Sequence, residues 1–154
     1  MSKIVSWIAL ILWISIIFNM SHQPSSVSNE LSKGITEVFV HKVETLQPNE
    51  DFKISEFNHI VRKNAHFFIY LVLGLLQINA LNRSKVRGIL GITFAFILCV
   101  IYAIFDEVHQ LFVPGRGAQV FDVLIDSAGT VTGIGIYLLI SKIVKTFRVL
   151  NLYR

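Results

Sequence analysis

Apolar residues in this chain are gathered into four long runs separated by polar segments. The runs cover residues 4–20, 65–81, 88–105 and 123–140. A helix needs roughly 17 to 25 mostly apolar residues to cross the hydrocarbon core of a bilayer. Each run meets that length. The pattern therefore predicts an all-α membrane protein, a four-transmembrane-helix bundle formed as a single domain over residues 1–154.

The first run resembles a signal peptide but is longer than one. An apolar signal core usually has about 7 to 15 residues, and this run has 17. The sequence that follows, Ser21-His22-Gln23-Pro24, also lacks a small-x-small cleavage site. We therefore expect an uncleaved first transmembrane helix.

The connections between the runs differ in length. The longest covers residues 21–63, and a period of three to four residues predicts an extracytoplasmic amphipathic helix near 29–46, between the first two membrane helices. The same period resumes at residue 54 and leads straight into the second run. A short basic hairpin follows at 82–87, and the last polar connection covers 106–122.

Charge predicts the orientation. One side of the membrane would carry eight basic residues and no acid, in the N-terminus, the hairpin and the tail at 141–154. The other side would carry six basic residues and all ten acids. Because short loops rich in Lys and Arg stay in the cytoplasm, we expect both termini there, in the cell membrane. Segments 21–63 and 106–122 would then lie outside.

Composition supports a membrane protein and argues against binding to nucleic acid. Hydrophobic residues make up 53% of the chain and charged residues 16%, whereas soluble domains carry about a quarter charged residues. The net charge is +4, but its distribution reflects insertion and contact with anionic lipid. The one cysteine, Cys99, lies within an apolar run, which favours a packing role.

The first group of candidate functional residues lies where the second run begins. Arg62, His66 and Tyr70 are four residues apart, so a helix places them on one face, with Lys63 close by. Lys, Arg and Tyr commonly anchor helix ends at the membrane interface. That structural interpretation accounts less well for His66, which lies just inside the apolar run.

The second group belongs to the sequence DEVHQLFVPGR at residues 106–116. If the third helix continues, Asp106, His109 and Gln110 share a face, Glu107 points slightly aside, and the Pro-Gly pair ends the helix. Such residues are costly near lipid unless they face partners, although at a helix end in water they cost little.

The third group begins the fourth run. Asp122 and Asp126 are one helical turn apart, and Asp122 could simply cap the helix. Asp126 lies a turn deeper and needs a partner, for which Arg116, Lys63, His66 and His109 are candidates. Below it, Gly129 and Gly133 form a small-xxx-small step that lets another helix approach closely.

Together these segments resemble the VanZ-like family of small bacterial membrane proteins. The matching motifs are RKxAHF with Tyr70 and Leu73-Gly74, DExHQxFxPGR, and DxxxD followed by Gly129 and Gly133. His22 stands in the first turn where the family pattern leads us to expect Ser. The resemblance implies a four-helix membrane domain at the cell envelope. The family is named after a protein that lowers susceptibility to the glycopeptide teicoplanin.

These charged groups suit a polar lipid head group. Basic residues would hold phosphate, while the acids could be counter-ions or could hold a divalent cation with a histidine. We expect a site for a phospholipid or a lipid-linked cell-wall precursor. Candidate catalytic residues are His66, His109, Asp106, Glu107 and Asp126. Candidate binding residues are Arg62, Lys63, Tyr70, Gln110, Arg116 and Asp122.

Both an enzyme and a binding protein fit these residues. An enzyme would use a histidine as base or nucleophile, but the sequence carries no established phosphatase signature and no obvious Ser or Cys nucleophile. The alternatives are a non-catalytic protein that binds or shields lipids, and a scaffold in which salt bridges pin the helices together. A homo-oligomer is compatible with all three.

Overall fold

The computed structural model describes residues 2–28, 30, 34 and 54–152. Four helices make up nearly all of the described chain: α1 (Lys3–Ser21), α3 (Ile54–Arg83), α4 (Gly88–Gln110) and α5 (Val120–Leu152). All four are long and apolar enough to cross a membrane. The predicted all-α membrane bundle is thus confirmed. The amphipathic helix predicted near 29–46 falls almost wholly outside the described residues.

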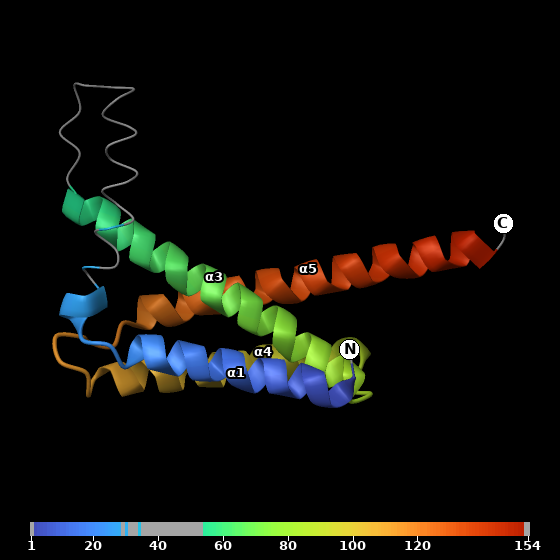
Figure 1. Cartoon of the computed structure of the whole chain (residues 1–154), viewed down its shortest axis with the longest axis horizontal. Coiled ribbons are helices and arrows are strands. Elements are labelled where there is room, and N and C mark those ends of the chain that lie inside the picture. Colours follow the sequence, from blue (N-terminus) through green and yellow to red (C-terminus); the bar gives the residue numbers. More distant parts are fainter. Residues whose placement is uncertain (1, 29, 31–33, 35–53, 153–154) are drawn as a thin grey trace, which may run out of the picture.

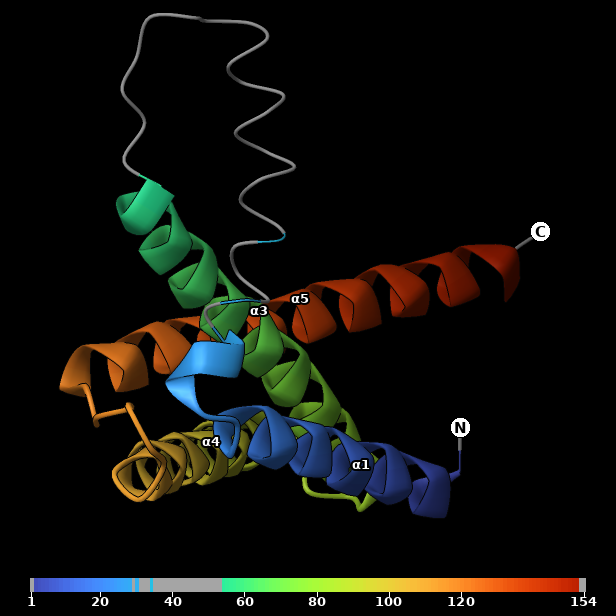
Figure 2. The same cartoon turned by 60° about the vertical axis from the view of Figure 1, so that its left-hand side comes forward.

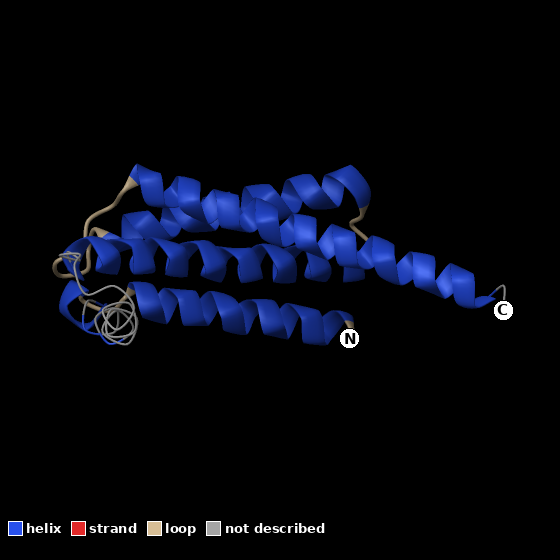
Figure 3. Cartoon of the chain, turned by 90° about the horizontal axis from the view of Figure 1, so that it is seen from above, coloured by secondary structure: helices blue, strands red, loops and turns tan. Residues whose placement is uncertain are grey.

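In Figure 1 the helices α1 and α4 lie alongside each other, and α3 and α5 cross obliquely; the view from above in Figure 3 shows all four extending between the two ends of the bundle. The helix α1 begins, and α5 finishes, at the end of the bundle that holds the 84–87 hairpin, which we call the hairpin end. At the opposite end, the site end, α1 and α4 finish and α5 begins. The helix α5 continues past the other three at the hairpin end. It therefore includes most of the predicted tail at 141–154.

Each helix boundary follows from local sequence. Ser2 caps α1 by accepting a hydrogen bond from the amide of Val5 at 3.3 Å. Pro24 lies just beyond the end of α1. The helix α3 begins at Ile54, as the renewed periodicity predicts, and α4 ends at Gln110, four residues before Pro114.

Glycines hold α3 and α5 against each other. A methyl group on Gly129 or Gly133 would collide with the main-chain carbonyl oxygen of Phe67 or Leu71. A methyl group on Gly74 would lie 2.5 Å from the carbonyl oxygen of Thr130. The predicted small-xxx-small step is confirmed, with α3 as its partner, and the two helices cross at this contact (Figure 2).

Side-chain hydrogen bonds attach α1 to the other helices. The indole N–H of Trp13 donates to the carbonyl oxygen of Ile69 at 3.0 Å. The hydroxyl of Tyr102 donates to the carbonyl oxygen of Ile14, also at 3.0 Å. The core between these helices includes Cys99, whose side chain is buried as predicted. These bonds attach the middle of α1 to α3 and α4.

Candidate functional site

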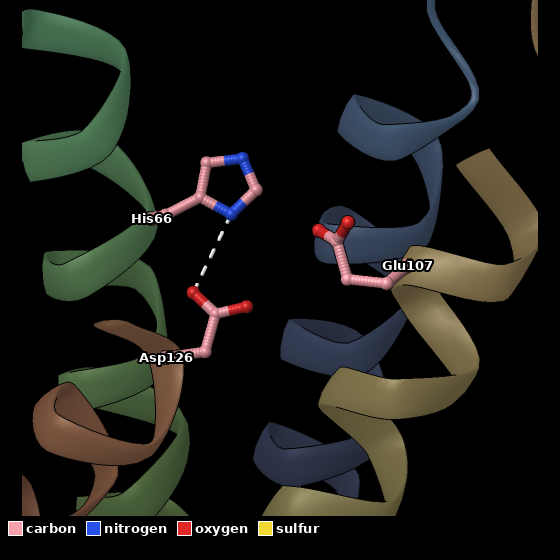
Figure 4. Close-up of side chains that lie close together, drawn as sticks. All are labelled: His66, Glu107 and Asp126. Carbon is pink, nitrogen blue, oxygen red and sulfur yellow. Dashed lines mark ion pairs between the residues drawn. The ribbon is translucent and has the colours of Figure 1, made fainter. Parts of the chain in front are cut away.

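Three helices each bring one ionisable side chain to a common point at the site end. His66 comes from α3, Glu107 from α4 and Asp126 from α5 (Figure 4). The Nδ1 atom of His66 lies 3.4 Å from Oδ1 of Asp126. One nitrogen or oxygen atom from each of the three residues lies within 4.8 Å of the other two. We call this group the buried triad.

Asp126 occupies the least accessible position of the buried triad. Its side chain is 0% exposed, and that of His66 is 14% exposed. Neither carboxylate oxygen of Asp126 has a hydrogen-bond partner among the described residues. A buried carboxylate without donors is costly. The carboxyl is therefore either protonated and neutral, or ionised with its charge balanced by a protonated His66 or by a bound cation.

The buried triad fits a divalent cation. Imidazole nitrogen and carboxylate oxygen together suit metals such as Zn²⁺ and Mn²⁺. Ligands at about 2.1 Å from a tetrahedral ion lie about 3.4 Å from one another, and His66 and Asp126 already have that separation. Glu107 would need to approach the other two residues more closely, because the three ligand atoms lie within 4.8 Å of one another. Three protein ligands would leave positions for water and a substrate oxygen.

Glu107 points into the bundle, and the expectation that it points aside is wrong. Asp106, Glu107 and Gln110 form the buried face of α4. The Gln110 amide lies 3.4 Å from an oxygen of each acid. The main-chain amide of Gln119 donates to the other oxygen of Glu107 at 2.8 Å. These bonds position both carboxylates.

Asp106 faces α1. The hydroxyl of Ser21 donates to its carboxylate at 2.8 Å, in a buried contact between the ends of α1 and α4. Ser21 was not among the candidate residues. Its place at the end of the first apolar run was the only signal in the sequence, because the partner lies 85 residues further along the chain.

His109 lies outside the buried triad. Its Nε2 atom is 3.2 Å from Nδ1 of His22, and the ring packs against Phe18 with 4.7 Å between centroids. This contact is on an exposed surface. His22, noted in the sequence only as a departure from the family pattern, is therefore the partner of His109. The structure brings His66 and Asp126 together but directs His109 elsewhere.

A cavity of about 150 Å³ opens beside the triad. Its lining includes His66, Asp106, Tyr70, Arg62 and Arg116. Tyr70 is almost wholly buried, and its hydroxyl has no hydrogen-bond partner among the described residues. The cavity therefore combines cationic groups with an unpaired hydroxyl.

Arg116 is held in a partly buried position. Its Nη2 atom donates to the carbonyl oxygen of Met20 at 3.4 Å. Burial lowers the pKa of Arg116, and the nearby charge of Arg62 lowers it further, although the acids Asp106 and Glu107 act in the opposite direction. A guanidinium stays charged in proteins. The two arginines outweigh Asp106, the carboxylate that lines the same cavity, so the lining favours an anion as the ligand.

The remaining candidates lie at the edge of the site. The Lys63 ammonium lies 4.5 Å from the centroid of the Phe121 ring and does not line the cavity. Asp122 is buried in the first turn of α5, and its Oδ1 atom has no hydrogen-bond partner among the described residues. The positive end of the helix dipole stabilises a carboxylate in that turn.

Comparisons with known proteins identify a family. No curated protein and no solved structure matches the chain. The sequence model of the VanZ/LLP1 family matches residues 6–141. That match includes the buried triad and most of the four helices. The chain therefore belongs to the VanZ/LLP1 family.

Proposed function

We propose that the site end binds the phosphorylated head group of an envelope lipid or a lipid-linked cell-wall precursor. The observation that carries the proposal is the cavity that places Arg62 and Arg116 beside His66 and Asp106. Arginine binds phosphate through two parallel charge-assisted hydrogen bonds. The hydroxyl of Tyr70 supplies a further donor to a phosphate oxygen.

A lipid fits this position better than a soluble phosphate compound. The cavity lies at the ends of membrane-crossing helices, and apolar side chains such as Ile17 and Ile69 also line it. The outer faces of these helices carry large exposed apolar residues, including Phe68 and Phe105. An acyl or isoprenyl chain can therefore remain in the bilayer while its head group enters the cavity.

The buried triad favours a second proposal, metal-dependent hydrolysis of that phosphate ester. His66, Glu107 and Asp126 would hold a divalent cation, which would supply a nucleophilic water at neutral pH and a positive charge for phosphate oxygens. Arg62 and Arg116 would orient the phosphate and stabilise the negative charge of the transition state. Asp106, fixed by Ser21, borders the same cavity and is a positioning residue.

A purely structural salt-bridge network explains the site less well. A stabilising buried ion pair requires hydrogen bonds to the remaining carboxylate lone pairs. Asp126 lacks them among the described residues, and its contact with His66 is 3.4 Å long.

A binding protein that shields a precursor without cleaving it would use the same arginines as the enzyme. The hydrolase and the shielding protein therefore differ in whether the bound lipid is turned over.

The experiment uses the purified full chain in detergent or nanodiscs. Phosphatidic acid and isoprenyl phosphates or diphosphates are supplied with Mn²⁺, Zn²⁺ or Mg²⁺, and both binding and released phosphate are measured. Loss of binding in Arg62→Gln and Arg116→Gln supports the head-group site. Phosphate release that disappears in Asp126→Asn supports hydrolysis, whereas binding without release favours the shielding protein. If none of these lipids binds, the head-group proposal is wrong.

An effect on teicoplanin susceptibility follows from the same proposal. A protein that binds or alters a lipid-linked cell-wall precursor changes the amount of that precursor available at the outer surface. The minimal inhibitory concentration of teicoplanin should then rise in a susceptible bacterium that expresses the chain. Expression of the Arg62→Gln, Arg116→Gln double variant at the same level should leave it unchanged.

A further inference from the structure

A second polar cavity lies at the hairpin end of the bundle, remote from the buried triad. It has a volume of about 490 Å³ and lies between the α3–α4 hairpin and α5. Three cationic side chains line it: Arg83 from α3, Arg87 before α4 and Lys145 from α5. Asn82, Tyr137 and Ser141 add polar groups to the same wall.

The cations of this cavity have no acidic residue near them in sequence. Residues 78–105 and 127–154 contain no Asp or Glu at all. The two segments include the hairpin and the part of α5 that faces it. Three positive charges around one cavity repel one another, so an anionic ligand would stabilise this arrangement.

The geometry of the arginines favours phosphate. The Nε atom of Arg87 donates to the carbonyl oxygen of Asn82 at 3.4 Å, and its terminal nitrogens have no hydrogen-bond partner among the described residues. Arg87 precedes α4 and makes no side-chain capping bond, while Gly88 lines the cavity. Main-chain amides of the first helical turn can therefore also donate to an anion.

We propose that this cavity binds the phosphate group of an anionic membrane lipid. A lipid is favoured over free phosphate because the half-exposed Leu138 also lines the cavity and the exposed Ile140 lies two residues further along α5. Basic pockets between membrane helices on the cytoplasmic side bind such head groups. The distribution of Lys and Arg predicts that the hairpin end faces the cytoplasm. The proposal is independent of the site end.

The test measures retention of phosphatidylglycerol and phosphatidylcholine by the full chain in native mass spectrometry. The test variant is Arg87→Gln, Lys145→Gln. The matched control is Lys85→Gln, Lys142→Gln, which removes two exposed charges from the same end without touching the cavity lining. We expect the test variant to lose roughly thirtyfold in affinity for phosphatidylglycerol and the control to lose little.

Three results would overturn the proposal. Equal losses in the two double variants would show general attraction of charge to the membrane surface. Equal retention of phosphatidylglycerol and phosphatidylcholine by the unmodified chain would show that the anionic head group is not recognised. Thermal stabilisation by inorganic phosphate without retention of phosphatidylglycerol would reject a lipid ligand. All the altered side chains are exposed, and circular dichroism verifies that both variants remain folded.

Discussion

The Nδ1 atom of His66 and the Oδ1 atom of Asp126 lie 3.4 Å apart, although the residues are 60 positions apart in sequence and belong to different helices. Glu107 approaches the same point from a third helix. This contact gives Asp126 its nearest possible source of positive charge. Removing the carboxylate charge of Asp126 distinguishes the two explanations of this contact. A metal site would lose its affinity for metal, whereas a structural ion pair would lose stability.

Substitution Asp126→Asn should abolish metal binding without unfolding the protein. The amide keeps the shape of the side chain but loses the charge, so affinity for Mn²⁺ or Zn²⁺ should fall by at least about a hundredfold. Isothermal titration calorimetry measures the affinity. The melting temperature of the metal-free protein should stay the same or rise, because the amide avoids the cost of burying a carboxylate that has no hydrogen-bond donor among the described residues. A large fall in melting temperature would instead support the scaffold.

The two histidines should respond differently to replacement by alanine. His66→Ala removes a ligand from the buried triad and should reduce metal affinity as strongly as Asp126→Asn. His109→Ala removes a ring that contacts Phe18 and His22, so affinity should remain within about twofold. The measurement is the same calorimetric titration. Equal losses in both variants would mean that His109 enters the site when metal binds.

Two glycines of α5 provide a matched pair for the helix crossing. Gly133→Ala places a methyl group against the carbonyl oxygen of Leu71, whereas Gly135→Ala places it in open space. We expect Gly133→Ala to destabilise the protein by about 1–3 kcal/mol and Gly135→Ala to be neutral or slightly stabilising. Unfolding in detergent, followed by circular dichroism, measures both. Similar stabilities would contradict close packing of α3 against α5.

The orientation can be tested with single cysteines. The natural thiol, Cys99, is buried and should react little with a membrane-impermeant maleimide. Lys85→Cys in the hairpin should be labelled only after the cells are opened, because basic short loops remain in the cytoplasm. Gly117→Cys, between α4 and α5, should be labelled on intact cells. The reverse pattern would show that the chain is inserted with the opposite orientation.

The membrane bundle could be predicted because each of its elements is visible locally. Length and apolar character define the four helices, and Gly129 with Gly133 marks the face of α5 that meets another helix. His66 and Asp126 could be singled out because an ionisable residue within an apolar run needs a partner. None of these inferences depends on knowing which helices are neighbours.

The details of the site could not be predicted, because helix rotation determines them. Asp106 and Glu107 are adjacent, so a turn of about 100° on α4 separates their directions. The packing of α4 against α1 and α5 places Asp106 beside Ser21 and Glu107 near Asp126. The same rotation leaves His109 with His22. Such pairings depend on contacts between segments that are distant in sequence.

The crossing of α3 and α5 also has a consequence for the precision of the site. Gly129, which meets the carbonyl oxygen of Phe67, follows Asp126 by three residues, and Phe67 follows His66 directly. No side chain separates the two backbones there. Sliding one helix along the other by a single residue would displace the pair by about 1.5 Å, enough to disrupt a metal site. The glycine contact thus fixes the position of α3 along α5, and with it the distance from His66 to Asp126.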